Sequence, residues 1–180
     1  GMIAQRAAID VPERVLSLTS IMSATGAPGT LDATPEAAAV LNSTPPDPKA
    51  DFEAFVAHAV KNARVIGSPA YPWTDDDLRE RAIAEHRRAF NPAGVARQLA
   101  AVRADGDRTA ALAAVKVPTV VLHGAVDPLV PPRGGEATAA AIAGAELRMI
   151  EGMGHDLPPG LYDIFIDAIV AAVSRAKAAA

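Results

Sequence analysis

Two apolar segments late in the chain, each followed by a loop with one titratable side chain, constrain the fold most. Residues 119–122 are apolar and β-branched and lie between a proline and a glycine, which predicts a buried strand ending just before Asp127. Residues 147–150 predict the next strand, and His155 follows it. The amphipathic segment 134–143 predicts a helix between the two strands. This order is that of a parallel crossover, so Asp127 and His155 are expected at the same carboxyl edge of a sheet, where open α/β sheets place their sites.

The loops that carry these two residues differ in composition. Two prolines follow Asp127 and are expected to stiffen its loop. Gly152 and Gly154 come just before His155, and their conformational freedom predicts a mobile loop.

A carboxylate beside an imidazole is the arrangement that activates a nucleophile. The carboxylate orients the imidazole and stabilises the imidazolium, while the imidazole removes the proton of a serine. The order Asp127 and then His155, late in the chain, is that of α/β-hydrolases. Two simpler interpretations stay open: Asp127 could cap the turn that follows it, and His155 could be a loop histidine satisfied by local hydrogen bonds.

The sequences around both residues resemble those of a known family. His123-Gly-Ala-Val-Asp-Pro-Leu-Val-Pro131 and Gly152-Met-Gly-His-Asp-Leu-Pro158 are similar to the acid and histidine segments of esterase-like α/β-hydrolases, of the aclacinomycin methylesterase kind. Together with residues 14–23, the resemblance covers most of the chain. It implies an incomplete α/β-hydrolase fold of about three late parallel strands with flanking helices, plus an inserted helical lid.

The resemblance also implies an activity. The parent reaction is hydrolysis of a carboxylic ester without a cofactor, in which a serine attacks, His155 acts as base and then acid, and Asp127 orients His155. Met22, Trp73 and Leu129 are expected to line a pocket for a small-molecule ester, although Trp73 could equally pack inside the lid.

The nucleophile of this family lies in a Gly-x-Ser-x-Gly motif, and that motif does not occur in the 180 residues. The following helix often begins Gly-Met-x-Ala-Gln, and this chain opens Gly1-Met-Ile-Ala-Gln5. We therefore expect the chain to begin just after the position of the serine. Gly1 is then either the last glycine of the motif or a residue left by tag removal ahead of a reading frame starting at Met2.

Helical signals fill the middle of the chain and divide it into two regions. Residues 1–23 and 116–180 are expected to form the partial α/β-hydrolase core, with a helix over 2–9, a strand over 15–22 and a long amphipathic helix after residue 161. Residues 24–115 are expected to form the helical lid, and Thr74 is expected to cap one of its helices.

Composition excludes several classes of function. The net charge of -4 gives no basic surface for nucleic acid, and the absence of cysteine excludes disulfides and thiolate metal sites. No two histidines have a metal-ligand spacing, and His123 is expected to be structural, with its ring bonded to loop backbone. No segment has the roughly 20 apolar residues of a membrane span, and no signal peptide is visible, so the expected location is cytoplasmic.

Two further functions stay open beside ester hydrolysis by one chain. The chain could be a non-catalytic remnant that acts as a binding or assembly module, or half of an enzyme that another chain completes. The strand over 15–22 carries no Lys, Asp, Glu or Pro within residues 15–22 to protect its edge, so we expect a homodimer through residues 1–22.

Overall fold

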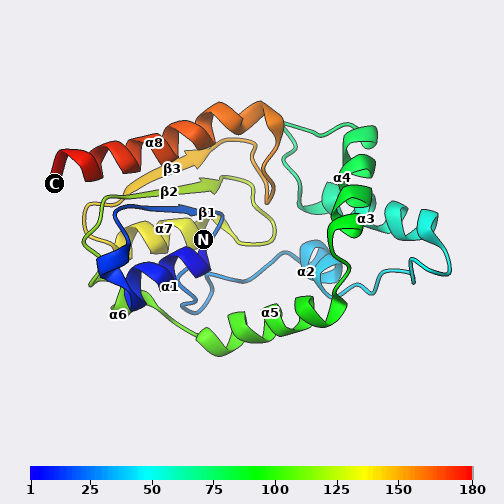
Figure 1. Cartoon of the computed structure of the whole chain (residues 1–180), viewed down its shortest axis with the longest axis horizontal. Coiled ribbons are helices and arrows are strands. Elements are labelled where there is room, and N and C mark those ends of the chain that lie inside the picture. The colour runs from blue at the N-terminus through cyan, green and yellow to red at the C-terminus, as the bar shows by residue number, and fades with distance from the viewer. Residues whose placement is uncertain (180) are drawn as a thin grey trace.

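The computed structural model describes residues 1–179, which contain a three-stranded parallel sheet. The strands are β1 (Leu18–Ile21), β2 (Thr119–Gly124) and β3 (Glu146–Ile150), in the order β1-β2-β3. Every residue of the central strand β2 is buried, as its β-branched and apolar sequence predicts. Figure 1 shows the three strands side by side, with their carboxyl ends pointing toward the helices between β1 and β2.

The strand expected over 15–22 is shorter than predicted. Residues Pro12–Arg14 form a 3₁₀ turn, and Leu16 is 78% exposed, so the ladder with β2 begins only where Leu18 pairs with Thr119. The proline-initiated turn occupies the residues just before the expected strand, and the chain reaches the sheet three residues later than the apolar pattern indicated.

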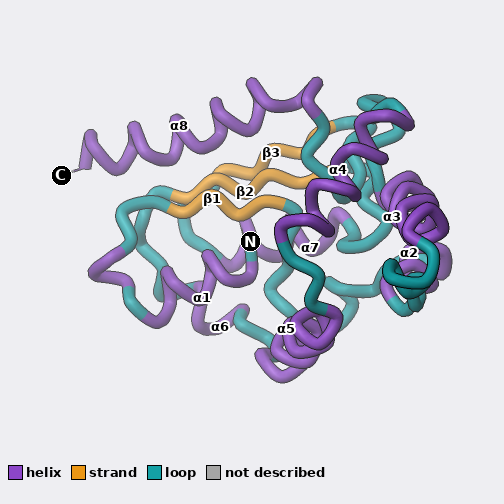
Figure 2. The backbone as a smooth tube through the Cα atoms, turned by 45° about the vertical axis from the view of Figure 1, so that its right-hand side comes forward, coloured by secondary structure: helices purple, strands orange, loops and turns teal. Residues whose placement is uncertain are grey.

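Helices cover both faces of the sheet (Figures 1 and 2). One face carries α8 (Tyr162–Ala179), and the other carries α1 (Met2–Asp10), α6 (Thr109–Leu112) and α7 (Pro132–Ala141). Each face has its own apolar cluster, as expected for a sheet with two packed layers. The α8 side includes Val120, Leu122, Ile150, Met153, Leu161, Phe165, Ala168 and Ala172. The opposite side includes Ala8, Leu18, Leu112, Val115 and Ile142.

The apolar face of α8 is narrower than its sequence indicates. The buried positions are Leu161, Phe165, Ala168 and Ala172, at helix spacing. Ile164, Ile169 and Val173 were expected on the same face but are 39%, 45% and 38% exposed. A helix on a sheet buries the stripe directly beneath it, and apolar residues on its flanks need a further neighbour to be covered.

The segment between β1 and β2 contains four helices with side-chain caps, namely α2 (Pro35–Leu41), α3 (Phe52–Ile66), α4 (Asp75–Arg88) and α5 (Pro92–Asp105). In Figure 1, α2, α3 and α4 lie beyond the carboxyl ends of the strands, and α5 runs below the sheet. Each begins with a side chain that accepts a hydrogen bond from the backbone of its first turn, as N-caps do. These caps are Thr34, Asp51, Thr74 and Asn91.

Helices α6 and α5, both within residues 24–115, differ in how closely they pack on the rest of the chain. α6 packs against α1 and α7, and Leu112 and Val115 belong to the apolar cluster under the sheet. By contrast, no described residue of α5 is buried, although its Gln98 and Val102 help to form a cavity described below. Every helix within residues 1–179 is too short or too polar to cross a bilayer.

We predict a homodimer through α1 and β1. Within the described residues no strand pairs with the outer edge of β1, and Ile3 and Leu16 beside it are 79% and 78% exposed. A two-fold axis would let this edge meet its own copy and bury more than about 1,200 Å² in total. Sedimentation at micromolar concentration should give a dimer, and Leu16→Lys should dissociate it.

Leu41→Lys is the matched control for this prediction, because Leu41 is 49% exposed at the end of α2, a helix that packs against α3. This variant should remain dimeric. A stable wild-type monomer would contradict the prediction, whereas a dimer that survives Leu16→Lys would contradict only the proposed interface.

Candidate active site

Asp127 lies just beyond the carboxyl end of β2, and its two carboxylate oxygens have different partners. Oδ1 accepts hydrogen bonds from the backbone N–H groups of Leu129 and Val130, at 2.9 and 2.8 Å. Oδ2 lies 2.7 Å from Nδ1 of His155, and the Asp127 side chain is fully buried. The carboxylate therefore both caps the turn and holds the imidazole, so the two interpretations of Asp127 are compatible.

His155 lies beyond the end of β3 and is fixed at its backbone as well as its ring. Its N–H donates to the carbonyl of Ile66 at 2.7 Å, and its side chain is 23% exposed. A carboxylate accepts a hydrogen bond from an imidazole N–H, so Nδ1 carries the proton toward Asp127. Nε2 is then the nitrogen available to a reactant. The predicted meeting of Asp127 and His155 is confirmed, whereas their catalytic roles stay a prediction.

The glycines before His155 serve close packing, which corrects the expectation of a mobile loop. A Cβ at Gly154 would lie 2.3 Å from the carbonyl oxygen of Gly67. Gly152 has φ +69°, and a Cβ there would lie 2.3 Å from Cβ of Ala70. The turn is therefore pressed against the chain after α3, and any side chain at these two positions would force the two segments apart.

His123, in β2, is structural as expected. It is fully buried, and its Nε2 donates to the carbonyl of Val130 at 2.8 Å, while Asp127 Oδ2 lies 3.6 Å away. Burial lowers the pKa of His123 below its ordinary value of about 6.5, although the Val130 carbonyl and the Asp127 carboxylate act in the opposite direction. A neutral imidazole thus supports the loop that carries Asp127.

A cavity of about 550 Å³ opens beside His155. The residues that line it come from α1, the end of β1, α5 and the two loops at the sheet edge. They are Gly1, Met2, Ile3, Arg6, Met22, Ser23, Gln98, Ala101, Val102, Asp105, Val130 and His155. Met22 therefore lies where the predicted pocket requires it, and its φ of +47° is unusual for a residue with a Cβ.

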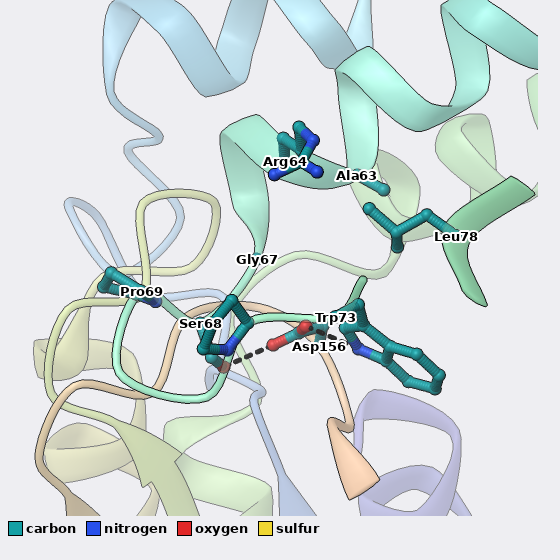
Figure 3. A pocket seen from close by; sticks show the side chains of 9 residues that line it. Ala63, Arg64, Gly67, Ser68, Pro69, Trp73, Leu78 and Asp156 are labelled. Carbon is teal, nitrogen blue, oxygen red and sulfur yellow. Dashed lines mark hydrogen bonds between the residues drawn. The ribbon is translucent and has the colours of Figure 1, made fainter. Parts of the chain in front are cut away.

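The other two residues expected to bind substrate do not line this cavity. Val130, rather than Leu129, lines it, and Leu129 contributes its backbone N–H to the turn capped by Asp127. Trp73 lines a cavity of about 150 Å³, where its Nε1 donates to Asp156 Oδ2 at 3.1 Å (Figure 3), and another of about 240 Å³ that His155 also lines. Trp73 is thus tied to the residue after His155.

Sequence reasoning missed the polar contacts that join the His155 turn to the insertion. Ser68 donates to Asp156 and accepts from the backbone N–H of Gly154, at 3.0 Å for the latter. Ser68 and Asp156 are 88 positions apart, and although Asp156 lies in the histidine segment, no pattern in the sequence pairs it with Ser68. The one available signal was the position of Asp156 directly after the candidate base.

Comparison with known proteins agrees with this geometry. No family model matches the sequence. The chain is 28% identical to the rhodomycin D methylesterases of Streptomyces sp. strain C5 and Streptomyces peucetius, over 94% of its own length. It spans 62% of the length of these relatives.

Solved structures give the fold. A meta-cleavage product hydrolase from Pseudomonas fluorescens superposes with a TM-score of 0.69 at 20% identity, over 97% of this chain and 61% of the other. A hydrolase from Pseudomonas aeruginosa gives 0.62 at 27% identity, over 97% and 60%. The chain has the α/β-hydrolase fold. In this fold, Asp127 and His155 follow β2 and β3, as the sequence resemblance predicted.

We predict that Asp127 contributes more to stability than His155. Asp127→Ala removes the acceptor of three N–H groups, two of them on the backbone, and should lower the free energy of unfolding by about 2–4 kcal/mol. His155→Ala removes only the ring contact of a partly exposed side chain and should cost about 1 kcal/mol. Urea unfolding of both variants tests this, and equal losses would contradict it.

The depressed pKa of His123 predicts acid sensitivity. Because the folded state resists protonation at this ring, the unfolded state binds the extra proton as the pH falls below about 6.5. Stability from this residue is complete above that pH and is lost toward the lower, folded-state pKa, with a slope of up to about 1.4 kcal/mol per pH unit. His123→Gln should flatten this part of the unfolding profile. An unchanged slope in His123→Gln would refute the assignment.

Proposed function

We propose that Asp127 and His155 are the acid and base of a carboxylic-ester hydrolase. The observation that supports this most is the 2.7 Å contact between Asp127 Oδ2 and His155 Nδ1, at the carboxyl ends of neighbouring parallel strands. A buried carboxylate fixes the tautomer and stabilises the imidazolium, which leaves Nε2 to take a proton.

The proposed reaction follows from these positions. His155 Nε2 takes the proton of a serine hydroxyl while the serine oxygen bonds to the ester carbonyl carbon. The resulting imidazolium then gives the proton to the departing alcohol, and a water attacks the acyl-enzyme in the same way. Asp127 holds the His155 ring throughout, because its two oxygens keep their N–H donors.

The nucleophile is the part of this proposal that residues 1–180 do not supply in the usual motif. Ser23 is the one serine among the described residues that lines the cavity beside His155. It is 2% exposed, and Gln5 Nε2 donates to its oxygen at 3.5 Å, so it is poorly placed to attack a substrate. We therefore place the serine on a polypeptide segment outside these residues.

A small-molecule ester is the proposed ligand. The cavity walls near His155 are largely apolar, with Met22, Val102 and Val130 among them, while Arg6 and Asp105 provide a polar rim. An apolar cavity with a few polar groups is typical of small-molecule sites. The curated relatives are methylesterases by name, so methyl esters are the first substrates to test.

A second candidate is a non-catalytic binding or assembly module. The absence of Gly-x-Ser-x-Gly from the 180 residues favours it. Such a module would keep the cavity and the Asp127–His155 contact as structural features only.

We predict that the purified 180-residue chain shows no ester hydrolysis that depends on His155. Loss of the nucleophile alone costs about a millionfold in a serine hydrolase, so the remaining pair retains little activity. Turnover of a p-nitrophenyl ester should match that of His155→Ala, and a fluorophosphonate probe should label no serine. Rapid turnover that His155→Ala abolishes would overturn this, and Ser23→Ala would then test Ser23 as the nucleophile.

The same probe separates the two candidate functions in the source cells. A fluorophosphonate-labelled polypeptide that co-elutes with this chain, and whose labelling falls with His155→Ala, supports the hydrolase. A chain that elutes without any labelled serine supports the assembly module.

A further inference from the structure

We propose that Asp156 is a positioning residue that, with Ser68 and Trp73, fixes the imidazole of His155 against Asp127. We call these three residues the Asp156 clamp. The importance of the clamp for hydrolysis rests on the proposed function, but its existence is independent of it and is tested without activity.

The carboxylate of Asp156 is satisfied on both oxygens by the connection between α3 and α4. Oδ1 accepts from the hydroxyl of Ser68, and Oδ2 accepts from Nε1 of Trp73 at 3.1 Å. Figure 3 shows the two side chains approaching the carboxylate from the same connection. Hydrogen bonds to an ionised carboxylate are stronger than those between neutral groups.

Ser68 extends the clamp to the backbone of the His155 turn. Its side chain is almost fully buried, and its oxygen accepts from the N–H of Gly154 at 3.0 Å while the hydroxyl donates to Asp156. Three hydrogen bonds therefore run in series from Trp73 through Asp156 and Ser68 to Gly154. The bonds from Gly154 to Ser68 and from Ser68 to Asp156 run in one direction and polarise each other, while the bond from Trp73 holds the carboxylate in place.

Backbone contacts hold the same two segments together on either side of the clamp. His155 N–H donates to Ile66 at 2.7 Å, and Ala70 N–H donates to Gly152 at 3.1 Å. Because Gly154 packs directly on the carbonyl of Gly67, the two backbones leave no room for a side chain between them. The turn that carries His155 is thus held against the connection between α3 and α4.

The orientation of Trp73 is set independently of Asp156. The guanidinium of Arg81, on α4, lies 5.6 Å from the centre of the indole ring, within the range of a cation–π contact. The next residue, Thr74, caps α4 through the backbone of Asp77. The N–H of Trp73 is therefore presented to Asp156 by α4.

These contacts give His155 two attachments from different parts of the chain. Its ring is held by Asp127 after β2, and its backbone is held by the clamp and by Ile66 after α3. The short turn before His155 contains two glycines, which gain much conformational freedom when released. Without the clamp, the contact between the His155 ring and Asp127 must order this turn alone, so a smaller fraction of the molecules forms that contact.

The test is nuclear magnetic resonance of the whole chain at His155 and at the backbone of its turn. In the wild type we expect a downfield Nδ1 proton on His155 and slow hydrogen exchange at the amides of Gly154 and His155. Asp156→Asn keeps the shape of the side chain, but its N–H₂ group then faces one of the two hydrogen-bond donors, Ser68 or Trp73, and cannot accept from it. It should accelerate exchange at both amides about tenfold and weaken or abolish the Nδ1 signal, while amides of β2 exchange as before.

Three further variants make the result specific. Trp73→Phe keeps an aromatic ring but removes one donor, and Ser68→Ala breaks two bonds of the series, so the effects should increase in that order. Glu151→Gln neutralises an exposed carboxylate in the same loop and should change nothing. If Asp156→Asn fails to fold, Trp73→Phe alone decides the question.

Two outcomes would overturn the proposal. One is a wild-type Nδ1 signal and unchanged exchange at Gly154 and His155 in both Asp156→Asn and Trp73→Phe. The other is equal acceleration at all amides, β2 included, which would mean that Asp156 supports the fold as a whole and does not position the base. Neither outcome depends on hydrolysis, so failure of the clamp and failure of the proposed function are observed separately.

Discussion

The carboxylate of Asp127 is the interaction on which the rest of the site depends. One oxygen folds the loop after β2 by accepting two backbone N–H groups, and the other holds the ring of His155. The side chain is fully buried, so no water competes for these bonds and each unpaired donor would be costly. The same group therefore shapes its own loop and orients the ring of His155. This explains why the loop has a tight, proline-rich sequence around a single acidic residue.

The parallel sheet places this carboxylate within reach of the imidazole. β2 and β3 are neighbours, with Gly124 opposite Ile150, so the residues that follow them emerge at the same edge. The crossover through α7 joins these two strands within a short stretch of chain. His123 adds a second constraint, because its buried ring is bonded to Val130 and thereby holds the far end of the Asp127 loop. Strand register, the loop cap and a neutral histidine together define one position for the ring of His155.

Local sequence patterns were sufficient for the central strand, for the cap at Thr74 and for the meeting of Asp127 with His155, because each depends on residues close in sequence or on one crossover. The patterns failed where burial depends on distant partners. Leu16 continues an apolar run yet lies outside the ladder, and Ile169 continues the apolar face of α8 yet is 45% exposed. The glycines before His155 look flexible in the sequence, but Gly67, far away in the chain, makes them packing residues. Ser68 and Asp156 carried no periodic signal at all.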